Sequence, residues 1–231
     1  MILELADVVR AHESSRPRSL QTSIGPSEAG AACSRRLAYK MLGVDRVNTD
    51  SDPWAAIIGT SVHAWLDAAF LAENDRTEQE RWLCDIKVEL PTYMRGSVDL
   101  YDKKTATVVD HKVMGLTSLK KFKADGPSNL YRTQVHLYAC GLRMQGANVQ
   151  NVAIAAWSRT GYLRDAAWWT EPYDEQVVEE CLARIDALRT TTSLLGVGAL
   201  PLIPTADGPC SWCPYYLPAS TTIEDGCPGH A

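Results

Sequence analysis

The sequence predicts an α/β protein whose central mixed sheet is flanked by helices. Its 231 residues, of which 45% are hydrophobic, are enough to bury a sizeable core. Short runs rich in β-type residues fill 82–113, and two further strands are indicated at 151–158 and 165–171. Stretches in which apolar residues recur at helical spacing precede, separate and follow these strands. Helices and strands therefore alternate within one integrated domain.

Three segments of this domain differ in composition. Residues 1–50 contain Ser, Gly and Arg without sustained periodicity beyond a short helix at 34–43, which is typical of a cap over a larger unit. Residues 51–195 carry the predicted strands and the long helices, and they form the core. Residues 196–231 are rich in Gly, Pro and Cys without an obvious helix or strand, so this tail needs something to hold it.

The first long helix of the core is predicted to begin at "SDPW". Asp52 can accept hydrogen bonds from the exposed backbone N–H groups, and Pro53 suits the first helical position. We expect this helix to end near 72–76. An apolar stripe at helical spacing marks its buried face: Ile58, Val62, Trp65, Leu66, Ala69 and Phe70.

The segment after this helix predicts three antiparallel strands within 82–90, 94–101 and 105–113, and the letters "DKK" mark a hairpin turn. A polar loop is expected at 114–128, followed by a second helix at 129–146. The last long helix follows "EPYDE". Its buried stripe is predicted to contain Val177, Val178, Cys181, Leu182, Ile185 and Leu188.

Charge and cysteine content narrow the classes of function. The formal net charge of −5 argues against a protein that coats nucleic acid through bulk positive charge. The N-terminus lacks the charged-then-apolar layout of a signal peptide, and no window approaches the roughly 18 apolar residues of a membrane span. We therefore expect a cytoplasmic protein that does not enter a membrane. In a reducing compartment, clustered cysteines favour metal binding over disulfides.

The stretch "RGSVDLYDKKTATVVDHKVMG" places ionisable residues inside predicted strands. Asp110 and Lys112 point to one face, about 6.6 to 7 Å apart. A turn centred on Lys103 and Lys104 puts Asp99 opposite Val108 and diagonal to Asp110. Two carboxylates that close repel each other unless a cation lies between them, and hard oxygen ligands suit Mg²⁺ or Mn²⁺.

A nearby ammonium can orient a water bound to such an ion, which is an outline for metal-assisted attack on a phosphodiester. The alternative is a solvated polar face of a half-exposed hairpin, because alternating sheets have polar sides. His63 lies one turn after Gly59, so its helix face is clear of side chains where an ion would approach. In the second helix Gln134 and Tyr138 share one stripe, and a buried Gln needs hydrogen-bond partners.

Taken in order, the helix His, "GSVD", "VVDHK" and "QVHLY" resemble the motifs of RecB-like nucleases of the PD-(D/E)XK superfamily. The resemblance implies a restriction-endonuclease-like core. It also implies that the divalent metal is held by His63, Asp99, Asp110 and the backbone carbonyl of His111, and that Lys112 serves the attacking water. Gln134 and Tyr138 would contact DNA or order the site. Glu89 matches loosely a glutamate that often precedes the first metal Asp.

A basic window follows the proposed metal site. Between residues 112 and 132 five basic residues stand against the single acidic Asp125, an excess of four positive charges along which a phosphate backbone could run. The alternative is a solvated charged loop. The five basic residues are Lys112, Lys120, Lys121, Lys123 and Arg132.

Four cysteines form a separate group. Cys210 and Cys213 make a C-x-x-C, Cys227 follows in "GCPGH", and Cys33 stands far upstream before two arginines. A C-x-x-C can be half of a zinc site or a redox pair, but its place in an irregular tail favours structural metal ligation. This arrangement resembles the CRISPR-associated RecB-like exonucleases and the nuclease domain of AddAB-type helicase-nucleases.

The resemblance implies that these four cysteines hold a 4Fe-4S cluster that ties the tail to the N-terminal cap. Thiolates also bind zinc, which stays open as the alternative. The 13 residues between Cys213 and Cys227 exceed the spacing of compact family examples. Cys227 is therefore the least secure ligand, and His230 is a substitute for it.

The resemblance implies a stand-alone, metal-dependent DNA exonuclease that acts on single-stranded ends with 5′ to 3′ polarity, in recombination, repair or CRISPR-type DNA processing. Its partners would be DNA and recombination or CRISPR-adaptation proteins. An endonuclease or flap nuclease with the same site is one alternative. A non-catalytic DNA-binding or adaptor protein, held by an iron-sulfur cluster or by zinc, is the other.

Overall fold

The computed structural model describes residues 2–15, 23–49, 52–208 and 210–230. Residues 1, 16–22 and 50 of the predicted cap lie outside these residues, as do residue 51 of the predicted core and residues 209 and 231 of the predicted tail. The helices are α1 (Ile2–Ser14), α2 (Pro26–Ala29), α3 (Ser34–Met41), α4 (Trp54–Thr77), α5 (Leu116–Asp125), α6 (Asn129–Met144) and α7 (Glu175–Leu195). The strands are β1 (Trp82–Leu90), β2 (Met94–Asp102), β3 (Thr107–Met114), β4 (Asn151–Ser158) and β5 (Ala167–Pro172).

The five strands form one mixed sheet in the order β1-β2-β3-β4-β5. β1, β2 and β3 are antiparallel neighbours, as the sequence predicts. β4 lies parallel to β3 after a crossover that contains α5 and α6, and β5 returns antiparallel to β4. The mixed α/β sheet predicted from the sequence is confirmed.

The sheet divides beyond the β2–β3 turn. β2 and β3 pair only from Asp102↔Thr107 to Leu100↔Val109, and then β2 stays with β1 while β3 stays with β4. The predicted register was wrong: continuing the observed one puts Asp99 opposite Asp110, not opposite Val108. The turn spans residues 103–106 rather than two residues, which moves the pairing by two. Asp99 and Asp110 therefore lie at the fork between the diverging strands.

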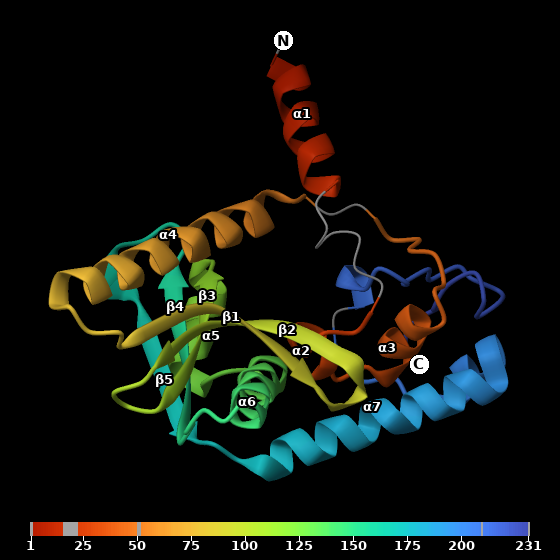
Figure 1. Ribbon diagram of the computed structural model, residues 1–231. Coiled ribbons are helices and arrows are strands. Elements are labelled where there is room, and N and C mark those ends of the chain that lie inside the picture. The colour runs from red at the N-terminus through yellow and green to blue at the C-terminus, as the bar shows by residue number, and fades with distance from the viewer. Residues whose placement is uncertain (1, 16–22, 50–51, 209, 231) are drawn as a thin grey trace.

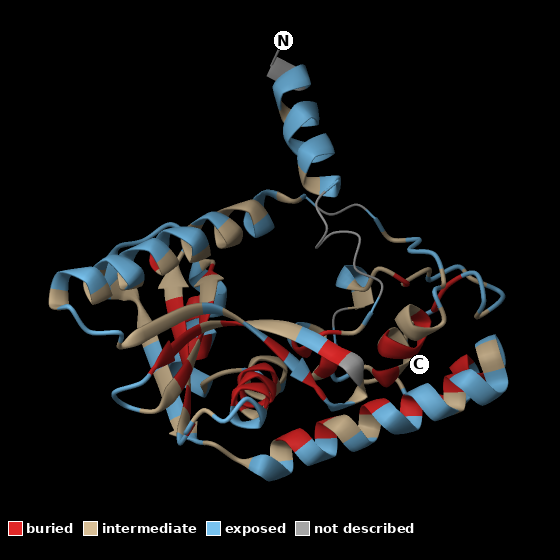
Figure 2. Cartoon of the chain, in the orientation of Figure 1, coloured by how far each residue is buried: buried red, intermediate tan, exposed pale blue. Residues whose placement is uncertain are grey.

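Helices cover both sides of the sheet. α4 crosses it on one side, and α6 and α7 lie on the other (Figure 1). Side chains of α5 and α6 share an apolar cluster with the strands, including Phe122, Val135 and Ile154. A second cluster joins α3 and α7 to the tail through residues such as Tyr39, Ile185 and Tyr215. Buried residues accordingly concentrate in the strands, in α6 and on the inner sides of α3 and α7 (Figure 2).

Two sequence predictions of local structure are corrected. The segment expected to be a polar loop at 114–128 contains α5, because Leu119 and Phe122 are three residues apart and both pack into the core between exposed lysines. The tail is not free of helices, since it contains 3-10 turns at Gly196–Leu202 and Cys210–Trp212. Both turns are too short to give a helical pattern in the sequence.

The stripe predicted for α4 is only partly buried. Leu66 is buried, whereas Trp65 is 69% exposed and Ala69 is exposed, because α4 packs on the sheet along a narrow line (Figure 2). By length and composition alone, α4 contains an 18-residue window apolar enough to cross a membrane, and among the described residues it is the one helix that does. The expectation that no stretch approaches this limit was wrong. Here α4 packs against β1 and β3.

The tail folds back on the N-terminal segment. The Arg35 guanidinium donates to the carbonyl of Ile203 at 3.0 Å, and the Asn48 amide donates to the carbonyls of Ser211 and Cys213 at 2.8 and 3.0 Å. The Tyr39 ring stacks on Tyr215 with the centroids 5.0 Å apart. Segments at opposite ends of the chain thus form one packed unit.

A buried carboxylate anchors the β2–β3 turn that sets the fork. Asp102, 4% exposed, accepts two hydrogen bonds from Arg81 at 2.8 and 2.7 Å, one from the Lys104 backbone N–H at 3.0 Å and one from the Thr105 hydroxyl at 2.7 Å. Burial alone raises the pKa of Asp102, but the hydrogen bonds from Arg81, Thr105 and Lys104 outweigh it and lower the pKa below 3.8. The ionised form is therefore the one that the fold stabilises.

Asp102→Asn should lower the free energy of unfolding by about 2 kcal/mol at pH 7, since it leaves Arg81 without its ionic partner. Because the pKa of Asp102 is lower in the folded state, this contribution is present above the unfolded pKa and is lost as the pH falls through the folded one. Urea unfolding of both proteins at pH 7 and below pH 4 measures this. A difference that stays constant with pH would contradict the assignment.

Candidate active site

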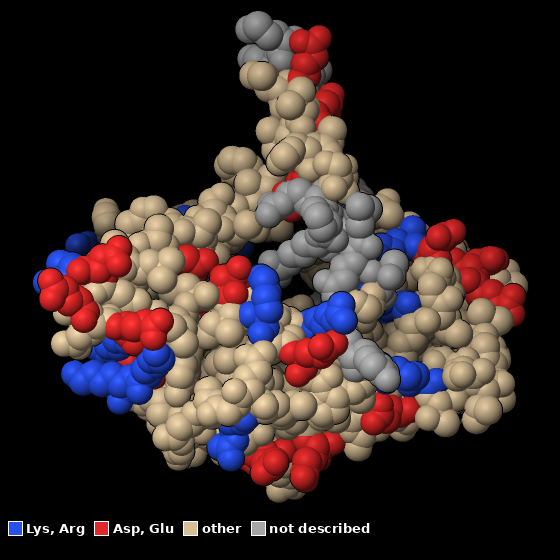
Figure 3. Space-filling model, viewed as in Figure 1, with Lys and Arg blue, Asp and Glu red and all other residues tan. Residues whose placement is uncertain are grey.

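The fork between β2 and β3 opens into a cavity of about 800 Å³. The strands contribute Asp99, Asp110, His111 and Lys112 to its wall, α4 contributes His63, and α6 contributes Gln134 and Tyr138. Acidic and basic side chains gather around a hollow beneath α4 in the space-filling view (Figure 3). The residues predicted to hold the metal, serve the water or order the site therefore meet at one cavity.

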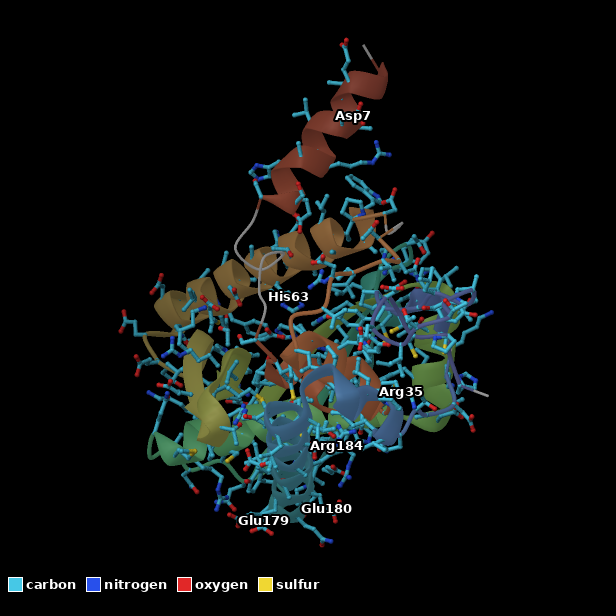
Figure 4. All side chains as sticks on the ribbon, turned by 90° about the vertical axis from the view of Figure 1, so that its right-hand side faces the viewer. Asp7, Arg35, His63, Glu179, Glu180 and Arg184 are labelled. Atoms are coloured by element: carbon cyan, nitrogen blue, oxygen red, sulfur yellow. The ribbon has the colours of Figure 1, made fainter. Side chains whose placement is uncertain are left out.

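Asp99 links α4 to the strand that carries Asp110. Its Oδ1 lies 3.4 Å from His63 Nδ1, and its Oδ2 accepts a hydrogen bond from the His111 backbone N–H at 2.7 Å. Burial raises the pKa of Asp99, but the hydrogen bond with His63 and the charge of His63 outweigh it, and the pKa falls below 3.8. His63 lies on the side of α4 that faces the body of the protein (Figure 4).

The contact with Asp99 also shifts the pKa of His63. Burial alone lowers it, and the hydrogen bond and negative charge of Asp99, with a smaller effect of Asp110, raise it above 6.5. Beside Asp99, His63 therefore holds its proton to a higher pH than a free imidazole does. A divalent ion at this position competes with that proton.

Asp110 and Lys112 form the second half of the site. The Lys112 ammonium lies 2.7 Å from Asp110 Oδ2 and donates to Gln134 Oε1 at 3.0 Å. The Gln134 amide in turn donates to the Tyr138 hydroxyl at 3.0 Å. The buried Gln134 thus finds the partners that its position requires, and it fixes the head group of Lys112. The ring of Tyr131 lies 4.9 Å from the same ammonium.

The Asp110 carboxylate is 1% exposed and incompletely satisfied. Its Oδ1 is buried and accepts no hydrogen bond from any described residue. Burial raises the pKa of Asp110 to about 6, with Lys112 opposing and Asp99 adding to the rise. A buried carboxylate oxygen without a donor is costly unless a cation or a water satisfies it.

His111 contributes its backbone on one side and a buried imidazole on the other. Burial lowers the pKa of His111 to about 4, so the ring is neutral. The Trp157 indole N–H donates to His111 Nδ1 at 3.3 Å, and the ring of Phe70 stacks on the imidazole at 5.9 Å. Neither contact is visible in the sequence. Trp157 reaches His111 only because β4 runs parallel to β3.

The residues present fit a hard divalent cation. Mg²⁺ and Mn²⁺ sites commonly use one or two carboxylates and complete their shell with waters and substrate phosphate. Asp99 and Asp110 supply two carboxylates to one cavity, and Asp110 Oδ1 is free to coordinate. Over the described ranges, no three His, Cys, Asp or Glu side chains are already arranged as a metal cage. The fit therefore depends on the two carboxylates and on ligands from solvent or substrate.

Other predicted residues lie elsewhere. Lys120, Lys121 and Lys123 are exposed on α5 and do not line the cavity. Glu89 is exposed, pairs with Arg95 at 3.1 Å and does not reach the cavity either. The lysines miss the cavity because α5 packs against β4 and β5. Glu89 misses it because this residue lies beyond the fork on β1.

Sequence reasoning missed several residues of the cavity wall. Asp67 lies on α4 one turn after His63, and Asp85 and Lys87 form an ion pair of 2.7 Å on β1. Burial, followed by the charges of Asp99 and Asp85, raises the pKa of Asp67. The i, i+4 spacing of His63 and Asp67 is the one signal that could have indicated this residue.

The four cysteines of the predicted cluster line a second cavity of about 280 Å³ between the N-terminal segment and the tail. Cys33 comes from the residue before α3, and Cys210, Cys213 and Cys227 come from the tail. The Sγ of Cys210 lies 3.2 Å from Nδ1 of His230. The fold therefore brings together thiols that are far apart in sequence, although no three of them are near enough in the described residues to form a metal cage as they stand.

No protein-family model and no curated protein sequence matches the chain. The crystal structure of an alkaline exonuclease, LHK-Exo, from Laribacter hongkongensis is similar, with a TM-score of 0.52 and 14% identity over 75% of this chain and 89% of the exonuclease. The crystal structure of LHK-Exo in complex with dAMP has a TM-score of 0.52 and 15% identity, over 78% of this chain and 95% of the exonuclease. The crystal structure of SSO0001 has a TM-score of 0.50 and 17% identity, over 81% of this chain and 86% of SSO0001. The chain thus shares the mixed α/β fold of an alkaline exonuclease.

Proposed function

We propose that the protein is a divalent-metal-dependent deoxyribonuclease of the PD-(D/E)XK type. One observation carries this proposal: Asp99, Asp110 and Lys112 meet at a fork in the sheet, where a buried carboxylate oxygen lacks a donor among the described residues. The sequence motifs and the fold shared with an alkaline exonuclease support the same reading. A solvated hairpin face, the alternative from sequence, does not agree with a carboxylate that is 1% exposed.

In this proposal Asp99, Asp110, the carbonyl of His111 and His63 hold Mg²⁺ or Mn²⁺. The bound ion would supply Lewis-acid activation of the phosphate and of a water. Lys112, held by Asp110 and Gln134, donates hydrogen bonds to the attacking water and to the phosphate oxygen on which charge develops. Water adds to phosphorus and the P–O bond to the leaving nucleotide breaks, giving one hydroxyl and one phosphate monoester.

The finer assignment is a cytoplasmic exonuclease that degrades single-stranded ends in the 5′ to 3′ direction. It rests on the motif resemblance to CRISPR-associated and AddAB-type nucleases, since the compared structures are named only as exonucleases or by a locus. Recombination, repair or CRISPR-adaptation proteins are the partners that this resemblance suggests. An endonuclease or flap nuclease with the same site, and a non-catalytic DNA-binding adaptor, are the alternatives.

We also propose that Cys33, Cys210, Cys213 and Cys227 hold a 4Fe-4S cluster that ties the tail to the N-terminal segment. Support comes from the shared cavity that all four thiols line and from the contacts that hold both segments around it. Zinc is the alternative occupant. His230 lies beside Cys210 and not at the position of Cys227, so it is less suited to substitute for Cys227.

End-labelled oligonucleotides test the proposed activity. With Mn²⁺ the purified protein should shorten a labelled single strand. Excess EDTA should stop the reaction, because it removes the divalent ion that the proposed site requires. Strands blocked at the 5′ or at the 3′ end separate the two polarities, and a circular single strand separates exonuclease from endonuclease. A protein that binds these strands and cleaves none of them with Mg²⁺ or Mn²⁺ is the adaptor of the alternative.

A further inference from the structure

An aromatic path leads from the active-site cavity to the surface over β4 and β5. His111 lines the cavity, and its ring lies 5.9 Å from that of Trp157, which donates to His111 Nδ1. Trp157 in turn meets the ring of Trp168 edge to face, with the centroids 5.0 Å apart. Trp168 is 66% exposed. Three rings in successive contact therefore join the cavity wall to an exposed indole.

The sheet register keeps this path on one face. His111 pairs with Ala155, and Ala155 pairs with Trp168, so the side chains of these three residues project to the same side of the sheet. Trp157 is two residues after Ala155 on β4 and therefore projects to that side too. α4 covers this side mainly over β1 and β3, and Trp168 on β5 is exposed. The backing by Trp157 fixes the orientation of Trp168. An exposed aromatic ring held in this way offers its free face to a ligand at a low cost in conformational entropy.

Positive charge lies in the loop that joins the same two strands. Arg159 and Arg164 are exposed, and neither forms an ion pair with a described residue. The Arg164 guanidinium lies 4.3 Å from the ring centroid of Tyr162, which is 66% exposed. The acidic residue of this loop, Asp165, accepts a hydrogen bond from the Tyr162 backbone. Aromatic faces and unpaired guanidiniums are together the chemistry that binds unstacked bases and phosphates.

We propose that the Trp168 surface, made of Arg159, Tyr162, Arg164 and Trp168, binds the bases and phosphates of a single DNA strand next to the bond that is cleaved. This inference rests on the proposed nuclease function and adds the place where the strand lies outside the cavity. A single strand is the occupant because duplex bases keep their faces stacked inside the helix. The arginines give the surface the sign of charge that phosphates require, in a protein that is acidic overall.

Binding without turnover tests the proposal. In excess EDTA, fluorescence anisotropy gives the Kd of the wild-type protein for labelled dT20, for an abasic strand of equal length and for a 20-base-pair duplex. Trp168→Ala should weaken dT20 binding roughly 5- to 150-fold, since stacking of one base is worth about 1–3 kcal/mol. Trp168→Phe should keep most of the affinity. Arg164→Ala should lower the slope of log Kd against log salt by about 0.7.

Trp65→Ala is the matched control, because Trp65 is 69% exposed on α4 and does not line the cavity. It should bind dT20 as the wild type does, and the abasic strand should bind the wild type more weakly than dT20. Three results overturn the inference: equal binding of dT20 by Trp168→Ala and wild type, equal binding of abasic and normal strands, or a Trp168→Ala loss as large on duplex. A protein that shows the expected binding but no cleavage with Mn²⁺ instead contradicts the proposed nuclease function alone.

Discussion

Asp110→Asn should reduce the rate of Mn²⁺-dependent DNA cleavage by roughly 10³-fold or more, because it removes the negative charge that the proposed cation requires. Asparagine has nearly the same shape as the aspartate, so the packing around this 1% exposed side chain is preserved. Lys112 loses the carboxylate 2.7 Å away but retains Gln134 at 3.0 Å. Initial rates on labelled single strands at saturating Mn²⁺ measure the effect.

Asp125→Asn is the matched control, since Asp125 is exposed at the end of α5 and lies outside the cavity. Its cleavage rate should equal that of the wild type. Circular dichroism of Asp110→Asn should show an intact fold, so that the loss of rate reports the site. If Asp110→Asn retains a rate within tenfold of the wild type, Asp110 is not a metal ligand for the reaction.

Cys213→Ser should cause the second large effect, on stability. A cluster that binds only the folded state contributes binding free energy to folding, and a tightly bound group supplies about 4 kcal/mol or more. For a chain of this size, that loss lowers Tm by roughly 8–16 °C. Cys213 lines the cavity that all four thiols share, so its removal should release the tail from the N-terminal segment. Thermal unfolding followed by circular dichroism measures the change.

Metal analysis of the same samples identifies the occupant. The wild type should be brown and contain about four iron atoms per chain, as a 4Fe-4S cluster requires, and Cys213→Ser should lose colour and iron together. Cys140→Ser, in α6 and away from this cavity, is the control that keeps both. A colourless wild type with one zinc supports the zinc alternative. A wild type with neither metal and a Tm equal to that of Cys213→Ser contradicts any metal in the tail.

The sequence alone was sufficient to predict the mixed sheet and the face of it that the charged residues share. Alternation alone places Asp110 and Lys112 on one side, and shifting the register by two residues leaves Asp99 on that same side. The prediction of the shared face was therefore unaffected by this two-residue change in turn length, although a one-residue change would have reversed it. The register itself was sensitive to it, because turn length depends on hydrogen bonds such as those to Asp102.

Contacts that depend on the crossover were beyond the sequence. Trp157 reaches His111 because α5 and α6 return the chain parallel to β3, and no local pattern encodes that neighbour. The exposure of Trp65 likewise depends on how α4 lies across the sheet, whereas its spacing only indicated a helix. The shared cavity of Cys33 and the tail cysteines was expected from resemblance rather than from residue spacing.

Diffraction at the manganese absorption edge from crystals soaked in Mn²⁺ tests the central claim most directly. The anomalous difference map should show a peak in the fork between β2 and β3, in direct contact with the carboxylates of Asp99 and Asp110. An empty fork, or manganese bound only at surface carboxylates away from the cavity, would contradict the metal-dependent site on which the proposed function rests.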